Sequence, residues 1–208
     1  MMSSRARFWI AVVLLAALWL AAMIAGGRDS SWDVAASDWL RSASVPILTR
    51  NAKVFATIGE PYVLVPIGIV AAAYLMFRRK RRAALFLIVV FGGRFLVELQ
   101  KVIIDRPRPH ISRALVAANS YSFPSGHAAN AMITFMAIAL LLPVRQRNRA
   151  IAVGIGLALA LQVGASSVIL DRHWASDALG GWMFGLLWVM ICVWAASARP
   201  DADASAGR

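Results

Sequence analysis

A serine, a glycine and a histidine (Ser125, Gly126 and His127) stand directly before a run of apolar residues. A Ser-Gly pair at the start of a helix presents unpaired backbone N–H groups, and the helix dipole favours an anion there. Histidine is the side chain best suited to transfer protons near neutral pH. The segment 121–127, which reads YSFPSGH, is therefore predicted to bind a phosphate group beside a proton-transfer group.

Two further groups of residues would complete a phosphoryl-transfer site. Upstream lies a basic cluster of Lys101, Arg106 and Arg108. Arginine binds phosphate oxygens through paired N–H groups and keeps its charge. Downstream, His173 and Asp177 are one helical turn apart, so the carboxylate can accept one imidazole N–H and leave the other nitrogen with its lone pair. A phosphate cradle, two imidazoles and an orienting carboxylate together predict phosphoryl transfer.

Both of these groups could also have a role without catalysis. The loop of Arg106 and Arg108 is stiffened by two prolines and is also suited to contact lipid headgroups. A pair such as His173 and Asp177 is often structural, or part of a metal site. The sequence offers no third or fourth metal ligand on the same side of the membrane as this pair, so we expect no metal.

The remaining charged residues are expected to be structural. Arg94 and Glu98 lie one turn apart within an apolar run and are predicted to form a buried ion pair. His110 is expected at the surface. A solvated face, rather than a catalytic role, is predicted for Asp29, Asp33 and Asp38.

The composition indicates a membrane protein. Of the 208 residues 60% are hydrophobic, and the mean hydropathy is +0.67, whereas a soluble domain is roughly half apolar. A net charge of +12 would suggest a nucleic-acid partner in a soluble protein. Here the basic residues fall between apolar runs, so we expect no nucleic acid and a lipid-facing basic surface instead. Cys192, the single cysteine, excludes an intrachain disulfide and is expected to be a packing residue.

Six apolar segments are predicted to be transmembrane helices: 8–26, 61–77, 83–104, 127–142, 150–170 and 174–196. The first could be a signal peptide, since arginines precede it, but its length and poor cleavage site favour a retained span. The segment 27–60 mixes charges with tryptophans and predicts one or two amphipathic helices at the membrane interface. Residues 197–208 form a polar tail.

Basic residues indicate the orientation in the membrane. Under six alternating spans, Arg5, Arg7, the segments 78–82 and 145–149 and the C-terminus all fall on one side, which the positive-inside rule makes cytoplasmic. The segments 27–60, 105–126 and 171–173 then lie on the other side. All residues of the possible site are therefore predicted to converge on the extracytoplasmic face.

Three motifs in order resemble the type 2 phosphatidic acid phosphatase superfamily, which includes bacterial membrane phosphatases of isoprenoid and glycerolipid phosphates. They are Lys101 with Arg108-Pro109, then the segment 124–127 (PSGH), then Ser166 with His173 and Asp177. The resemblance covers about residues 61–196.

The resemblance implies a role for each matching residue. His173 would be the nucleophile, forming a phosphohistidine and oriented by Asp177, and His127 would be the general acid that protonates the leaving lipid alkoxide. The phosphate oxygens would be held by Lys101, Arg108, Ser125 and the Gly126 backbone. No metal or other cofactor would be needed, because these donors supply the charge stabilisation.

One position departs from the pattern of the superfamily. Its third motif begins Ser-Arg, whereas this chain has Ser166-Ser167. Loss of one preorganised donor typically lowers the rate by about 10²–10³-fold. On a continuing helix, Arg172 would be turned about 140° from Ser167, so Arg106 is the better candidate substitute to bind phosphate. A slow enzyme and an inactive relative both remain open.

The sequence thus predicts an all-α membrane protein with six transmembrane helices, forming a single integral-membrane phosphatase domain over residues 1–208. We expect a lipid phosphatase of the bacterial inner membrane that acts on the extracytoplasmic leaflet. Undecaprenyl diphosphate, phosphatidylglycerol phosphate, phosphatidic acid and lipid A phosphate all stand as candidate substrates. The alternatives are a non-catalytic protein that binds or moves lipid phosphates and, less favoured, an acid phosphatase for soluble esters or a vanadate-dependent relative.

Overall fold

The computed structural model describes residues 3–28, 30–42, 45–109 and 121–197, which form helices and contain no β-strand. The elements are α1 (Ser4–Ala25), α2 (Ser31–Ser42), α3 (Pro46–Gly59), α4 (Pro61–Arg78), α5 (Lys80–Leu87), the π-helix η1 (Ile88–Gly92), α6 (Gly93–Ile104), α8 (Gly126–Leu141), α9 (Gln146–Ile169) and α10 (Ala175–Ser197). The predicted all-α membrane fold class is confirmed. His110 and the tail 198–208 lie outside the described residues.

Five helices are long and apolar enough to cross a membrane: α1, α4, the continuous stretch Lys80–Ile104, α9 and α10. Helix α8 is also apolar but has 16 residues, fewer than the about 20 that a spanning helix usually needs. The segment 27–60 holds two helices, α2 and α3, as predicted. Their position at a membrane interface stays a prediction.

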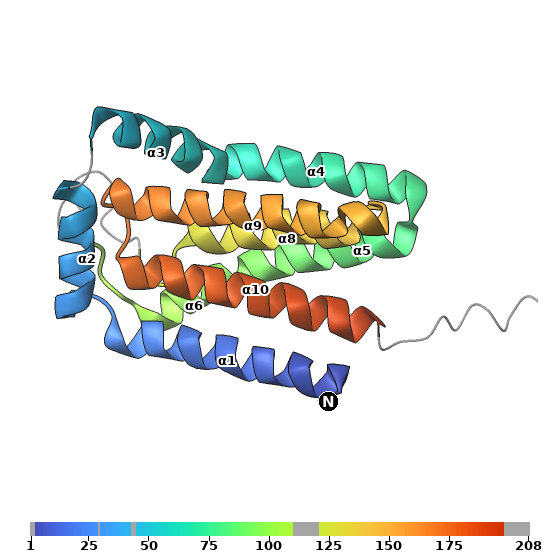
Figure 1. Ribbon diagram of the computed structural model, residues 1–208, viewed down its shortest axis with the longest axis horizontal. Helices are drawn as coiled ribbons and strands as arrows, with labels where there is room; N and C mark the ends of the chain where they lie inside the picture. Colours follow the sequence, from blue (N-terminus) through green and yellow to red (C-terminus); the bar gives the residue numbers. More distant parts are fainter. Residues whose placement is uncertain (1–2, 29, 43–44, 110–120, 198–208) are drawn as a thin grey trace, which may run out of the picture.

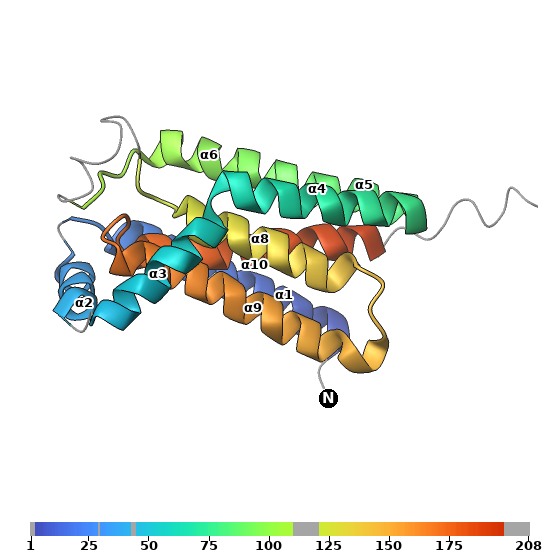
Figure 2. The ribbon, with the colours of Figure 1, turned by 90° about the horizontal axis from the view of Figure 1, so that it is seen from above.

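The long helices run side by side, and α2 lies across one end of the bundle (Figures 1 and 2). Helix α8 packs against both α9 and α10 and is the most buried element, because its residues are apolar around the whole circumference. Its N-terminus points toward the end of the bundle at which α2 lies.

Two glycines of α10 allow it to approach α8 closely. A Cβ atom on Gly181 would lie 2.8 Å from the carbonyl oxygen of Ser125, and one on Gly185 would lie 2.8 Å from Cβ of Met132. Small residues at such contacts let helix backbones come together, as is common between membrane helices. This contact places the start of α8 beside the start of α10, and so brings two of the sequence motifs together.

The π-helix η1 interrupts the stretch Lys80–Ile104 halfway along. Here the carbonyl oxygen of Val89 accepts a hydrogen bond of 2.8 Å from Nε1 of Trp188 on α10. The bond ties η1 to α10, and α6, which continues from η1, carries Lys101 in its last turn.

Helix α1 lies along α10. The rings of Phe8 and Trp194 are stacked with centroids 5.2 Å apart near one end of the pair. Near the other end, the backbone carbonyls of Ala22 and Met23 accept hydrogen bonds from Arg106. A retained first helix stays a prediction, and these contacts favour it.

Asp33 does not lie on a solvated face, so that prediction is wrong. Its side chain is fully buried and accepts hydrogen bonds from the backbone N–H of Gly27 (2.8 Å) and of Ser176 (2.9 Å), and from the Ser176 hydroxyl. The reason is that α2 folds across the end of the bundle and brings the carboxylate to the N-terminus of α10. Asp38 is exposed, as expected, and Asp29 lies outside the described residues.

Candidate active site

The predicted site residues gather at one end of the bundle. Residues 105–109 follow α6, residues 121–125 precede α8, and residues 170–174 connect α9 to α10, all at the end at which α2 lies (Figure 1). The basic turn between α4 and α5 lies at the opposite end. The helices alternate in direction, and the motifs therefore meet although Arg106 and Asp177, which are in contact, are 71 residues apart in the sequence.

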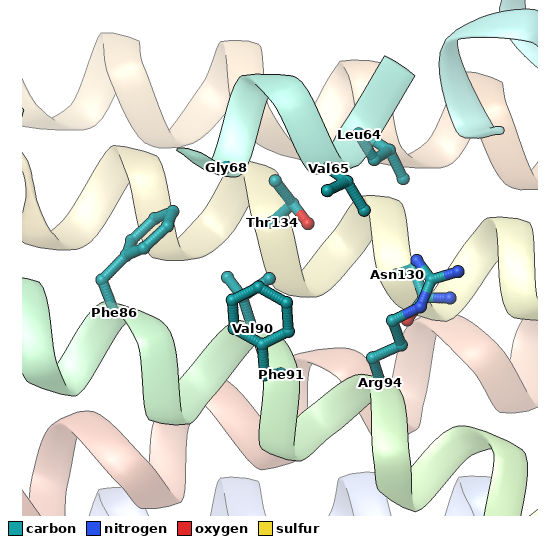
Figure 3. A pocket seen from close by; sticks show the side chains of 9 residues that line it. All are labelled: Leu64, Val65, Gly68, Phe86, Val90, Phe91, Arg94, Asn130 and Thr134. Carbon is teal, nitrogen blue, oxygen red and sulfur yellow. The ribbon is translucent and has the colours of Figure 1, made fainter. Parts of the chain in front are cut away.

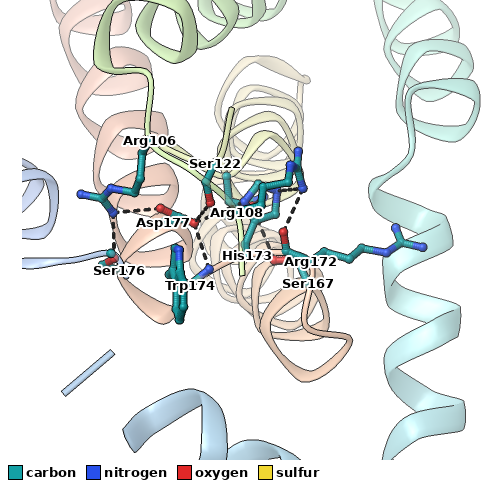
Figure 4. A network of polar contacts seen from close by, with 12 residues as sticks. Arg106, Arg108, Ser122, Ser167, Arg172, His173, Trp174, Ser176 and Asp177 are labelled. Atoms are coloured by element: carbon teal, nitrogen blue, oxygen red, sulfur yellow. Dashed lines mark hydrogen bonds and ion pairs between the residues drawn. The ribbon is translucent and has the colours of Figure 1, made fainter. Parts of the chain in front are cut away.

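Asp177 is fully buried, and donors surround its carboxylate. Its Oδ1 accepts a hydrogen bond of 2.9 Å from Nη1 of Arg106. Its Oδ2 accepts from the backbone N–H of Trp174 (2.9 Å) and from the hydroxyl of Ser122, and lies 3.5 Å from Nδ1 of His173 (Figure 4). These contacts hold the carboxylate in one orientation, with one oxygen turned to the imidazole. A separation of 3.5 Å is the outer limit of a hydrogen bond, and such bonds often tighten when substrate binds.

The imidazole of His173 is buried, and its two nitrogens face different partners. Nδ1 faces Asp177, and Nε2 lies 3.3 Å from Nη1 of Arg108. Burial lowers the pKa of His173 to about 4, although the neighbouring Asp177 opposes this effect. The imidazole is therefore neutral near pH 7. With its proton on Nδ1, toward the carboxylate, the lone pair on Nε2 is directed at Arg108.

The start of α8 has the predicted form. Ser125 is the N-cap, and its Oγ accepts a hydrogen bond of 3.4 Å from the backbone N–H of Ala128. Its own backbone N–H donates to the carbonyl oxygen of Asp177 at 2.9 Å. The ammonium nitrogen of Lys101 lies 3.0 Å from the point that a Cβ atom of Gly126 would occupy. A helix N-terminus and a lysine therefore face the same place, as an anion site requires.

Lys101 also makes an ion pair of 3.0 Å with Glu98, one turn earlier on α6. The ion pair predicted between Arg94 and Glu98 is therefore not the one found. The lysine attracts the acidic residue toward the end of the helix, while the arginine lies two turns deeper, beside α8.

Glu60 is a member of the site that sequence reasoning missed. It lies between α3 and α4, and its Oε1 is 3.4 Å from Nε2 of His127 and 3.0 Å from Nη1 of Arg172. The signal that could have revealed it is an acidic residue directly before Pro61, at the start of an apolar run. Ser122 was also missed, although it belongs to the segment 121–127.

Arg106 is engaged with the protein itself. Its guanidinium group donates to Ser176 and Asp177 at 2.9 Å each and to the carbonyls of Ala22 and Met23, and it stacks over the ring of Phe123 at 4.4 Å. The residue is 7% exposed. These contacts use the donors that a phosphate would need, so the geometry does not favour the predicted role of Arg106 as a substitute phosphate ligand.

Ser167, at the position of the missing arginine, is fully buried beside the cap of α8. Its Oγ donates to the carbonyl oxygen of Gly164 at 2.6 Å and lies 3.5 Å from Oγ of Ser125. The helical-wheel argument against Arg172 does not apply, because α9 ends at Ile169 and the backbone turns at Asp171, where φ is 57°. Arg106 and Arg172 extend to opposite sides of the site (Figure 4).

A small apolar pocket adjoins the site between α4, α8 and the continuous stretch of α5, η1 and α6 (Figure 3). Its polar members Arg94 and Asn130 lie together at one end. The amide nitrogen of Asn130 is 3.8 Å from the Cβ position of Gly126, so this end borders the start of α8. The remaining lining residues are Leu64, Val65, Gly68, Phe86, Val90, Phe91 and Thr134.

Among the residues that the structure describes, no three His, Cys, Asp or Glu side chains lie close enough together to hold a metal ion. The pair of His173 and Asp177 thus has no further ligand of these types around it in the described part of the chain.

Two proteins with related sequences align with most of this chain. Phosphatidylglycerophosphatase B of Bacillus subtilis is 33% identical over 173 residues, which are 81% of this chain and 85% of the relative. An undecaprenyl-diphosphatase of Sulfolobus acidocaldarius is 24% identical over 185 residues, which are 86% of this chain and 85% of the relative.

Solved structures agree with this relationship. A transmembrane PAP2-type phosphatidylglycerolphosphate phosphatase from Bacillus subtilis superposes with a TM-score of 0.82 at 29% identity, covering 92% of this chain and 98% of the other. LpxE of Aquifex aeolicus has a TM-score of 0.60 at 24% identity over 79% of this chain and 96% of its own, and shares the fold. The sequence also matches the PAP2 superfamily over residues 82–201. On these findings, the chain belongs to the PAP2 superfamily.

Proposed function

We propose that this protein is a membrane lipid phosphatase, which transfers a phosphoryl group from a lipid phosphate or diphosphate to His173 and then to water. One observation carries the proposal: a buried, neutral imidazole lies between an orienting carboxylate and Arg108, whose Nη1 is 3.3 Å from Nε2. This arrangement suits a nucleophile directed at a phosphate that the arginine holds. The phosphatase names of the relatives support the same reaction class.

In the first step, the lone pair on Nε2 of His173 attacks phosphorus while Asp177 holds the Nδ1 proton. A P–N bond forms and the bond from phosphorus to the lipid oxygen breaks. His127 donates a proton to this leaving oxygen. Lys101, Arg108 and the N-terminus of α8 stabilise the charge on the three oxygens that do not react.

In the second step, water replaces the lipid. His127, now neutral, accepts a proton from a water molecule whose oxygen attacks phosphorus. The P–N bond breaks, inorganic phosphate leaves, and His173 regains its lone pair. No metal takes part in either step, because arginine, lysine and backbone N–H groups supply the positive charge.

The lipid and the orientation are part of the proposal. Phosphatidylglycerol phosphate and undecaprenyl diphosphate are the first candidates, since relatives carry these names. The basic turn between α4 and α5 faces the cytoplasm in this proposal, so the site opens to the exterior of the inner membrane.

The test is phosphate release from these lipids by the detergent-purified chain, with a metal chelator present. We expect release by the wild type and by Arg50→Gln, an exposed control on α3. No release is expected from His173→Ala, and an acid-labile phosphorylated protein should form during turnover and be absent in this variant. Phosphate release by His173→Ala would contradict the role of His173 as the nucleophile. Loss of release when the chelator is added would contradict a reaction without metal.

A second candidate function is binding or movement of lipid phosphates without hydrolysis. The buried Ser167 favours it, because this position lies beside the cap of α8 and provides no cation. Binding of the lipids without release of phosphate from any of them would support this alternative.

A further inference from the structure

We propose that Arg172 binds the phosphate group together with Lys101 and Arg108, and that Glu60 is the positioning residue that holds Arg172 while the site is empty. The proposal rests on the phosphatase function proposed above and deepens it by assigning a cation to the site. Neither residue was selected from the sequence as part of the site.

The contacts of Glu60 are the first argument. One oxygen, Oε1, lies 3.0 Å from Nη1 of Arg172 and 3.4 Å from Nε2 of His127. An anionic oxygen thus sits between a guanidinium group and the imidazole that would protonate the leaving group. A phosphate oxygen would need the same two neighbours, so Glu60 takes the position of an anion while no substrate is present.

The link between Arg172 and Arg108 is the second argument. The backbone carbonyl of Arg172 accepts a hydrogen bond of 2.8 Å from Nη1 of Arg108, the same nitrogen that lies 3.3 Å from Nε2 of His173. Burial lowers the pKa of Arg108, Asp177 opposes this effect, and the like charge of Arg172 lowers the pKa further. The charge of Arg172 thus acts on Arg108, and a doubly charged phosphate bound by both side chains would offset this repulsion.

The exposure of the side chains is the third argument. The side chain of Arg172 is 38% exposed and that of Glu60 27%, whereas that of Arg106 is 7% exposed and bonded on several sides. An ion pair so open to solvent is weak, so little free energy is needed to transfer the guanidinium group from the carboxylate to a phosphate. Arg172 can therefore exchange partners, and Arg106 cannot without breaking a buried network.

The first experiment measures binding of inorganic phosphate to the detergent-purified full chain by calorimetry. Arg172→Gln should weaken binding by about 10- to 100-fold, as expected for a charge-assisted hydrogen bond. Arg172→Lys should weaken it less, and Arg50→Gln should leave it unchanged. Glu60→Gln should tighten binding, because it releases Arg172, and this gain should shrink when Arg172→Gln is also present.

The signs of these effects separate the proposal from a purely structural ion pair. A structural pair predicts that Glu60→Gln and Arg172→Gln both weaken binding. Unchanged phosphate affinity in Arg172→Gln, weaker binding in Glu60→Gln, or no phosphate binding by the wild type would each overturn the proposal.

The second experiment uses Ser167. If Arg172 already supplies the cation, Ser167→Arg should change phosphate affinity little in the wild type and should restore it in Arg172→Gln. An equal gain in both backgrounds would contradict the proposal. Because phosphate binding needs no turnover, a chain that binds phosphate through Arg172 but hydrolyses no lipid would refute the phosphatase function alone. Lipid hydrolysis that Arg172→Gln leaves unchanged would refute the present inference alone.

Discussion

Arg106 and Asp177 form a buried ion pair, with Nη1 and Oδ1 2.9 Å apart and side chains 7% and 0% exposed. The guanidinium group lies on the side of the carboxylate opposite His173. It therefore fixes the orientation of Asp177 and balances its charge, while the other oxygen, Oδ2, faces the imidazole of His173. The sequence of this loop predicted two phosphate ligands. In the structure, Arg108 faces His173, whereas Arg106 contacts the carboxylate of Asp177.

Replacing Arg106 should therefore destabilise the protein rather than remove a phosphate ligand. Arg106→Leu leaves Asp177 buried without its cation and should lower the free energy of unfolding by about 3–5 kcal/mol. Thermal unfolding in detergent measures this, with the exposed Arg50→Gln as the matched control. A variant with wild-type stability and much weaker phosphate binding would show instead that Arg106 holds the substrate.

The pH dependence should reflect the unusual state of His173. Its pKa of about 4 lies below the ordinary value of 6.5, so the imidazole of this proposed nucleophile is neutral above about pH 4 and should become inactive as the pH falls through that value. NMR of the imidazole C–H protons measures this directly, since the chain has 3 histidines and His173→Gln assigns the signal. The signal should not titrate between about pH 5 and 8. A midpoint near the ordinary value would contradict the buried, neutral imidazole.

The close approach of α8 and α10 should not tolerate a larger side chain. A Cβ atom on Gly181 would lie 2.8 Å from Ser125 O and 3.0 Å from the backbone nitrogen of Ala129, and backbone atoms cannot move aside easily. Gly181→Ala should lower stability by about 1–3 kcal/mol and reduce phosphate release, because the cap of α8 shifts relative to His173. Gly154→Ala is the control on α9, where no atom lies within 4 Å, and should be neutral or stabilising. Equal effects of the two substitutions would contradict the packing argument.

Asp33, which accepts hydrogen bonds at the start of α10, should stabilise the fold. Asp33→Ala leaves the buried N–H groups of Gly27 and Ser176 without an acceptor and should lower the free energy of unfolding by about 1–3 kcal/mol. Asp38→Ala, on the exposed side of the same helix, should have a smaller effect. Thermal unfolding of both variants tests this, and a solvated Asp33 would make the two effects equal.

Local features were readable from the sequence because they depend on neighbours along the chain. The lengths of the apolar runs predicted the long helices to within a few residues, and two amphipathic segments became α2 and α3. The Ser-Gly pair before an apolar run predicted the N-terminus of α8, since capping involves residues only three apart. The spacing of His173 and Asp177 predicted that the two would face each other, and they do, although His173 precedes the first residue of α10.

The partners of the charged side chains were decided by the tertiary structure alone. Arg106 and Arg108 are two residues apart in a loop without helical periodicity, so their directions depend on what packs around them. Only the folding of α1 and α10 around Arg106 turns it away from the phosphate position. Glu60 and Arg172 are separated by 112 residues and meet because the ends of α3 and α9 lie side by side. Helical spacing relates residues within one element, whereas an active site depends on distances between elements.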